Sequence, residues 1–82
     1  MQEPQQTKQI KKVIGVNIKA LRDEKQLSRR KFAEQLGVDQ MLVYKWERGD
    51  HRPSDLNLAV LARHGKRSPA WFYTDHSDEV AA

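Results

Sequence analysis

Apolar positions recur three or four residues apart along most of the 82-residue chain, which is the spacing of amphipathic helices. The first such stretch ends near Lys25, and its inner face consists of Ile10, Ile14, Ile18 and Leu21. Gly15 lies inside it and costs up to about 1 kcal/mol relative to alanine, so either a neighbour approaches closely there or the helix begins later. Residues 1–9 are polar and are expected to form a flexible arm, with Thr7 as a candidate helix cap.

Two short helices joined by a very tight turn are predicted between Ser28 and Gly49. Ser28 is a good N-cap for the first, whose apolar stripe consists of Phe32, Ala33 and Leu36. Gly37 accepts the left-handed conformation that ends a helix, and Asp39 is a fresh N-cap for a second helix over about 39–48. The spacing predicts a helix-turn-helix, carried by Ala33, Gly37, Val43 and Trp46.

The helix over about 39–48 divides into an apolar face and a displayed face when its residues are placed about 100° apart. Leu42, Trp46 and Val43 fall together on one side. The other side carries Gln40, Met41, Tyr44, Lys45 and Arg48. This mixture of amide, thioether, aromatic ring and cations suits the base edges and phosphates of a DNA major groove. The alternative is a merely solvated polar face, against which the tandem spacing of the helix-turn-helix argues.

Two more helices are predicted after Gly49. Pro53 or Ser54 opens the fourth helix, which His64-Gly65 closes and whose inner face holds Leu58, Leu61 and Ala62. Ser68-Pro69 opens a short fifth helix that contains Trp71, Phe72 and Tyr73. The expected fold is therefore an all-α bundle of five helices, with the domain over 10–74 and a disordered acidic tail over 75–82.

Charge is distributed unevenly along the chain, whose formal net charge is +4. Residues 1–52 hold twelve basic and seven acidic side chains, whereas residues 53–82 hold three and four. The positive charge therefore accompanies the helix-turn-helix, as a phosphate-binding face requires. The polar arm is also flanked by cations, namely Lys8, Lys11 and Lys12. These lysines raise the hypothesis that the arm contacts DNA, with a merely solubilising tail as the alternative.

Catalytic, metal and membrane functions find little support. The absence of cysteine excludes disulfides and thiolate zinc sites, and His51, His64 and His76 lack metal-ligand spacing. The acidic pairs Asp23-Glu24 and Asp78-Glu79 are adjacent in sequence and cannot form an acid/base dyad. No apolar run reaches membrane-spanning length and no signal peptide is evident. We expect a cytoplasmic protein, associated with the nucleoid when bound to DNA, that is not an enzyme and uses no cofactor.

Residues 10–73 resemble the lambda-repressor-like, Cro/XRE-type helix-turn-helix domains through the motifs LGV, WERG and SPAW at their present separations. The resemblance implies a compact five-helix domain and a homodimeric transcriptional regulator, usually a repressor. Such a regulator binds a palindromic operator in double-stranded DNA with its third helix in the major groove. The runner-up interpretation is a protein-interaction module, such as an antitoxin that binds a toxin, which would not need Gln40 or Lys45.

The resemblance also implies roles for individual residues. Base contacts are expected from Gln40, Met41, Tyr44 and Lys45, with water-facing bulk as the alternative for Met41 and Tyr44. Phosphate contacts are expected from Arg29, Arg30, Arg48 and Arg52. A structural ion pair is expected between Arg22 and Glu47. Subunit contacts, or else ordinary core packing, are expected of Trp71, Phe72 and Tyr73.

Overall fold

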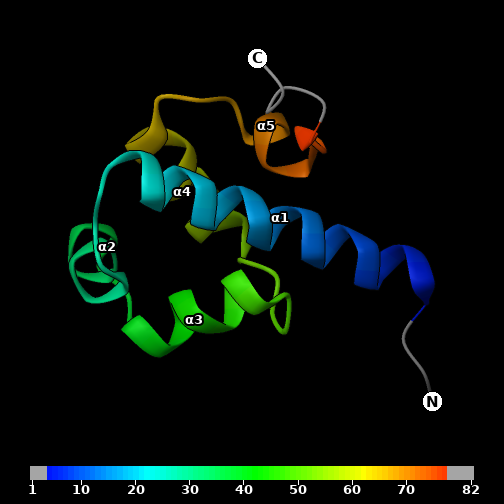
Figure 1. Ribbon diagram of the computed structural model, residues 1–82, viewed down its shortest axis with the longest axis horizontal. Coiled ribbons are helices and arrows are strands. Elements are labelled where there is room, and N and C mark those ends of the chain that lie inside the picture. The colour runs from blue at the N-terminus through cyan, green and yellow to red at the C-terminus, as the bar shows by residue number, and fades with distance from the viewer. Residues whose placement is uncertain (1–3, 78–82) are drawn as a thin grey trace.

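The computed structural model describes residues 4–77, and these form five helices in the predicted order (Figure 1). The helices are α1 (Gln5–Glu24), α2 (Arg29–Leu36), α3 (Gln40–Arg48), α4 (Asp55–Gly65) and α5 (Pro69–Tyr73). α1 crosses the whole molecule, packing against α3 on one side and α5 on the other, while α4 packs against α2 and α5. No strand occurs within residues 4–77, so the prediction of an all-α bundle is confirmed.

One hydrophobic core holds all five helices together. Its most deeply buried large side chains are Trp46, Phe32, Phe72, Ile14, Ile18, Leu21, Leu61 and Val43. Each fully buried side chain of this kind contributes about 1.5–3 kcal/mol by leaving water. Helices of eight or nine residues are only marginally stable in isolation, so α2 and α3 depend on this shared core.

The predicted helix caps are present at the start of α2 and at the tight turn between α2 and α3. The Ser28 hydroxyl accepts a hydrogen bond from the Lys31 backbone N–H at 3.1 Å, and the Asp39 carboxylate accepts one from the Met41 N–H at 2.7 Å. Gly37 ends α2 with a φ of 75°, a left-handed conformation that side-chain-bearing residues resist. The predicted boundaries of both helices are confirmed.

α4 and α5 also begin as predicted, but α4 ends differently. Ser54 rather than Pro53 is the N-cap of α4, because its hydroxyl accepts a hydrogen bond from the Asn57 N–H at 3.1 Å. α4 includes Gly65, and Lys66 takes the left-handed position with a φ of 54°. Gly65 instead gives room to Leu21, because a Cβ at residue 65 would lie 3.0 Å from both Leu21 methyl carbons.

α1 begins earlier than the sequence pattern indicated. Its first residue is Gln5, so residues 5–9 are helical rather than part of a flexible arm, and Pro4 rather than Thr7 precedes the helix. Glutamine and lysine have good helix propensity, and they extend a helix that the core already stabilises. The remainder of the predicted arm (residues 1–3) and most of the predicted acidic tail (residues 78–82) lie outside the described residues.

Gly15 marks the place where α1 and α3 cross most closely. A Cβ there would lie 2.9 Å from the Glu47 carbonyl oxygen and even closer to that of Trp46. The close approach of a neighbour, rather than a later helix start, therefore explains this glycine.

Asn17 fixes α5 to α1 and was not singled out by the sequence analysis. Its side chain is buried, and its Nδ2 donates to the carbonyl oxygens of Phe72 at 2.9 Å, Thr74 at 2.8 Å and Trp71 at 3.2 Å. A five-residue helix leaves most of its carbonyls without helical partners. Asn17 supplies the missing donor, so the short α5 is held in place by a side chain of α1.

Candidate nucleic-acid interface

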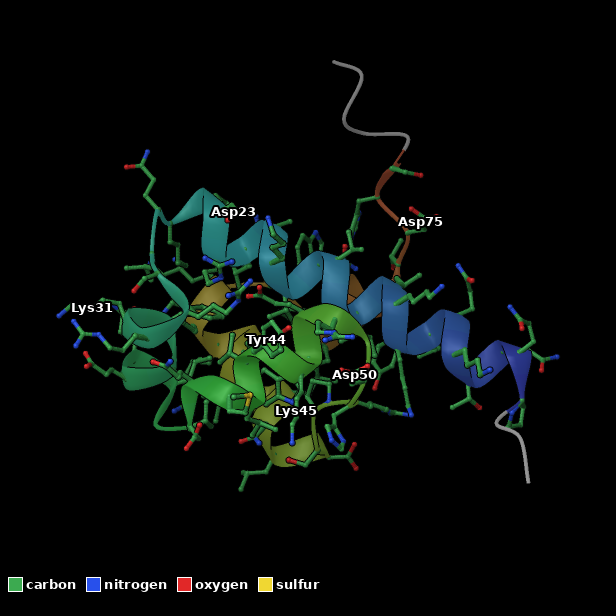
Figure 2. All side chains as sticks on the ribbon, turned by 60° about the horizontal axis from the view of Figure 1, so that its bottom comes forward. Asp23, Lys31, Tyr44, Lys45, Asp50 and Asp75 are labelled. Atoms are coloured by element: carbon green, nitrogen blue, oxygen red, sulfur yellow. The ribbon has the colours of Figure 1, made fainter. Side chains whose placement is uncertain are left out.

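The outward face of α3 displays polar and cationic side chains. Gln40, Met41, Lys45 and Arg48 are exposed, and Tyr44 is half-buried. Val43 and Trp46 are fully buried on the opposite face, which agrees with the division predicted from helical periodicity. Figure 2 shows Tyr44 and Lys45 on the near side of α3, between α2 and the loop that carries Asp50.

Tyr44 lies between two arginines. The guanidinium carbons of Arg29 and Arg48 are 5.1 Å and 5.5 Å from its ring centroid, within the range of cation–π attraction. Arg48 Nη1 also donates to the Tyr44 hydroxyl at 3.1 Å, and this hydrogen bond, with help from Asp50, raises the pKa of Arg48. Tyr44 is therefore held in a defined orientation rather than extending freely into water.

Two hollows lie on either side of Met41. The smaller, of about 230 Å³, is lined by Arg29, Gln40, Met41 and Tyr44. The larger, of about 470 Å³, lies between α3 and the start of α4, and its polar lining includes Lys45, His51, Arg52 and Asn57. Met41 lies between them and is 54% exposed, so its thioether is available for contact with another molecule.

Arg22 and Glu47 form a two-point ion pair beneath this surface. Arg22 Nε donates to Glu47 Oε2 at 2.7 Å and Nη2 donates to Oε1 at 3.0 Å. The Glu47 side chain is only 3% exposed, and the hydrogen bond to it raises the pKa of Arg22 against the opposing effect of burial. Arg22 also donates to the Leu27 carbonyl oxygen at 2.9 Å, so the pair joins α1 and α3 to the segment before α2.

Arg29 shares the same carboxylate, which the sequence analysis missed. Its Nε donates to Glu47 Oε1 at 3.1 Å, while its side chain remains 44% exposed. Eighteen residues separate the two in sequence. Local spacing gave no signal for this contact; it depends on the crossing of α2 with α3. Two arginines on one carboxylate leave a net positive charge beside Tyr44.

The remaining predicted phosphate-binding arginines lie in α2, at the end of α3 and in the loop that follows α3. Arg30 is exposed in the first turn of α2, and Arg48 is exposed at the end of α3. Arg52, in the loop after α3, donates from Nη2 to the Tyr73 hydroxyl at 2.6 Å. The structure thus places Arg48 and Arg52 at and after the C-terminal end of α3, whereas Arg29 lies beside Tyr44 on the side of α3 that faces α2.

The aromatic residues of α5 occupy three different environments. Phe72 is fully buried, so for this residue the alternative of ordinary core packing holds and not that of a subunit contact. Trp71 is half-buried, stacked on His76 at 4.7 Å between ring centroids and covered by the Arg67 guanidinium at 4.3 Å. Tyr73 is 39% exposed, so only Trp71 and Tyr73 offer surface to another molecule.

Clusters of metal-binding side chains and membrane-spanning helices are both absent from the part of the chain that the structure describes. No group of three or more histidine, cysteine or acidic side chains is arranged to hold a metal ion there. None of the described helices is both long enough and apolar enough to span a bilayer.

The fold and the displayed helix define a helix-turn-helix DNA-binding domain. A helix-turn-helix family model, HTH_3, matches residues 18–72, and the chain belongs to this family. The resemblance inferred from LGV, WERG and SPAW is confirmed. The family is one of DNA-binding transcriptional regulators and not of enzymes.

Two individual proteins are similar to this chain. The HTH-type transcriptional regulator DicA of Escherichia coli K12 is 32% identical over 66 residues, a match that covers 80% of this chain and 49% of DicA. The chain therefore spans about half the length of this curated relative. The crystal structure of the hypothetical transcription factor NHTF from Neisseria matches with a TM-score of 0.77 and 20% identity, covering 99% of this chain and 92% of that one. The latter similarity shows the same fold.

Proposed function

We propose that this protein represses transcription by binding a palindromic operator in double-stranded DNA as a homodimer, with α3 in the major groove. The observation that carries the proposal is the displayed face of α3, where Gln40, Met41 and Lys45 stand exposed, with Arg29 of α2 beside Tyr44 and Arg48 at the C-terminal end of the helix. A helix that served only as scaffold would need neither this set of donors nor the exposed thioether.

Base readout is assigned to four side chains of α3. The Gln40 amide can pair with adenine through two hydrogen bonds, and Lys45 can donate to guanine O6 and N7. Met41 and Tyr44 line the hollow of about 230 Å³ together with Gln40 and offer apolar surface suited to a thymine methyl group. Each good base contact of this kind discriminates against the wrong base by about 1–3 kcal/mol.

Phosphate contacts are assigned to Arg29, Arg30, Arg48 and Arg52. Arg48 is already oriented by Tyr44 and Arg52 by Tyr73, which reduces the side-chain entropy lost on binding. α2 has no acidic residue in its first turn, where its three successive cations oppose the helix dipole. Nearby phosphates would offset that cost, which supports contact between this helix end and DNA.

The homodimer is assigned to the exposed part of α5. Trp71 and Tyr73 offer the partly exposed aromatic surface that is enriched at protein interfaces. Two-fold symmetry of the protein would match a palindrome whose half-sites lie about 34 Å, or one helical turn, apart. DicA is named as a transcriptional regulator and NHTF as a transcription factor, which agrees with a regulatory role.

The proposal is tested by selection from a random duplex library at about 150 mM salt, where non-specific electrostatic binding is already weakened. We expect a palindrome to be enriched by the wild type and by Lys25→Ala, which changes a lysine outside the assigned contacts. Lys45→Ala should lose or relax the preference at one position in each half-site. A reporter carrying the selected palindrome in its promoter should then be silenced by the wild type and by Lys25→Ala, and less strongly by Lys45→Ala.

Absence of enrichment by the wild type would overturn the proposal. If a protein partner then copurified and its binding were unaffected by Lys45→Ala, the chain would be a protein-interaction module. An enriched but asymmetric site bound by one chain would overturn the homodimer.

A further inference from the structure

The face of α1 that packs on α3 continues beyond the end of α3. Gly15 lies against the carbonyls of Trp46 and Glu47, and one turn earlier Lys12 lies against Gly49, whose Cβ, if present, would be 3.4 Å from the Lys12 Cα and Cγ. The first turns of α1 extend farther, past the ends of α3 and α5, in both views (Figures 1 and 2). This N-terminal part of α1 is thus fixed by packing to the C-terminal end of α3.

The continued face is cationic. At about 100° per residue, Lys8, Lys11 and Lys12 all point within about 60° of the direction of Gly15. Lys8 and Lys12 are exposed and Lys11 is half-buried. From Gln5 to Arg22 the helix contains four lysines, one arginine and no acidic residue.

These lysines occupy the end of a helix where cations are unfavourable. The helix dipole places partial positive charge at the N-terminus, and α1 has neither an acidic residue in its first turn nor a side-chain cap. Lys8, at the end of the first turn, is therefore unfavourably placed with respect to the helix dipole, whose effect falls off within that turn. An anion placed beside them would reverse the sign of this interaction, because both the lysines and the helix end attract negative charge.

The distances suit a DNA backbone. Lys8 lies seven residues before Gly15, which is about 10 Å along the helix axis. The major groove is about 12 Å wide, so a helix fixed to the end of α3 can reach from the groove to a phosphate strand at its edge.

We propose that the first two turns of α1 form a second DNA-contacting element, in which Lys8 and Lys12, supported by Lys11, bind phosphates beyond the C-terminal end of α3. This inference rests on the proposed function, because it requires α3 to lie in the major groove. It differs from a flexible arm because the lysines are held on one helical face by the contacts at Gly15 and Gly49. Asp75 lines a cavity of about 230 Å³ with Lys12, so one carboxylate is also close to this face.

The test measures operator affinity as a function of salt for the full chain. Lys8→Gln/Lys12→Gln should weaken binding about tenfold near 100 mM salt and lower the slope of log K against log salt by about one per lysine and chain. The selected sequence should not change, because phosphate contacts carry no base information. Lys25→Gln, at the other end of α1, should bind as the wild type does. Circular dichroism should show that all variants remain helical.

A charge-conserving variant distinguishes binding by one defined face of α1 from a general attraction of DNA to positive charge. Gln6 points about 160° away from Lys8 around α1, so Lys8→Gln/Gln6→Lys moves one cation to the opposite face without altering net charge. The slope of log K against log salt should fall as far in this double variant as in Lys8→Gln alone. Recovery of the full slope would overturn the inference in favour of non-specific charge.

The two proposals fail in distinguishable ways. A wild-type protein that binds its operator, together with an unchanged slope in Lys8→Gln/Lys12→Gln, would overturn the inference and leave the proposed function in place. A wild-type protein that binds no operator would overturn both.

Discussion

Glu47 is the residue on which the polar structure of the domain converges. It accepts hydrogen bonds from Arg22 and Arg29, and it is almost completely buried. The consequences of losing it differ for the two arginines. Arg22 is 11% exposed and would keep as its charged partner only the Asp23 carboxylate, which is 3.8 Å away and 54% exposed, whereas Arg29 is 44% exposed and can return to water.

Glu47→Gln should therefore lower the free energy of unfolding by about 3–5 kcal/mol, because its amide keeps the shape but not the charge. Arg29→Gln should cost less than about 1 kcal/mol, as expected for a half-exposed pair. Urea unfolding of both variants measures the difference. A Glu47→Gln variant as stable as Arg29→Gln would contradict a structural role for the buried pair.

His64 makes stability depend on pH. Its Nε2 lies 2.7 Å from the Gln35 Oε1, and its ring packs edge-on against Phe32 with centroids 5.3 Å apart. Its buried Nδ1 makes no hydrogen bond within the described residues. Burial, with a smaller effect of Lys25, lowers the pKa of His64 below its ordinary value of 6.5. Between the folded pKa and 6.5, the unfolded chain therefore binds more protons than the folded one.

It follows that stability should be complete above about pH 6.5 and decline as the pH falls toward the folded pKa. Urea midpoints measured between pH 5 and pH 7.5 should show this decline in the wild type and in His51→Gln, whose histidine is exposed. The decline should be smaller in His64→Gln. Equal pH dependence in all three proteins would show that His64 does not carry the effect.

At the scale of the elements, two positions require glycine for two different physical reasons. Gly15 faces the carbonyls of α3 with no room for a Cβ, although its helical conformation suits any residue. Gly37 has open space around it but a φ of 75° that disfavours side chains. One position limits how closely two helices approach, and the other limits how the chain turns between them.

Gly15→Ala should destabilise the domain by about 1–3 kcal/mol, because overpacking exceeds the helix-propensity gain. It should also weaken operator binding, since α3 must move away from α1. Gly37→Ala should cost about 1 kcal/mol through backbone strain, with a smaller effect on binding. Thermal unfolding and operator titration on both variants compare them, and equal or greater stability in Gly15→Ala would contradict the close crossing.

The elements also show what the sequence could and could not predict. Helix ends at Ser28, Gly37 and Asp39 follow from short-range chemistry, and the displayed face of α3 follows from helical periodicity. The Arg22–Glu47 pair was predicted only from the family resemblance, because no local pattern joins residues twenty-five apart. The carboxylate shared with Arg29 and the contacts of Asn17 with three carbonyl oxygens were not predicted, and the sequence left open whether Phe72 packs in the core, since each depends on how distant elements cross.

At the scale of the whole molecule, the domain is a flat body measuring 35 × 34 × 19 Å. The positive charge lies mainly in residues 1–52, which comprise α1 to α3 and their loops, while α4 and α5 are nearly neutral. The proposed DNA-contacting residues of α2 and α3 and the proposed dimer contact on α5 therefore come from parts of the sequence that differ in net charge.

The proposed homodimer is tested at Tyr73. Tyr73→Ala should shift the monomer–dimer equilibrium toward monomer and reduce affinity for a full palindrome more than for a half-site. Tyr73→Phe removes only the hydroxyl that accepts from Arg52 and should keep the dimer. Sedimentation velocity with and without operator measures both, and a wild-type protein that stays monomeric on a palindrome would contradict the assignment.

The sharing of Glu47 bears on how the domain would search DNA. Arg22 alone engages both oxygens of this carboxylate, so Arg29 can leave it without stranding a buried anion. A phosphate that recruits Arg29 must nevertheless displace an existing internal partner. That displacement is required on random DNA as well as on an operator. The internal acceptor would therefore reduce what the Arg29–phosphate contact adds to non-specific affinity, so that the base contacts of α3 supply a larger share of the total.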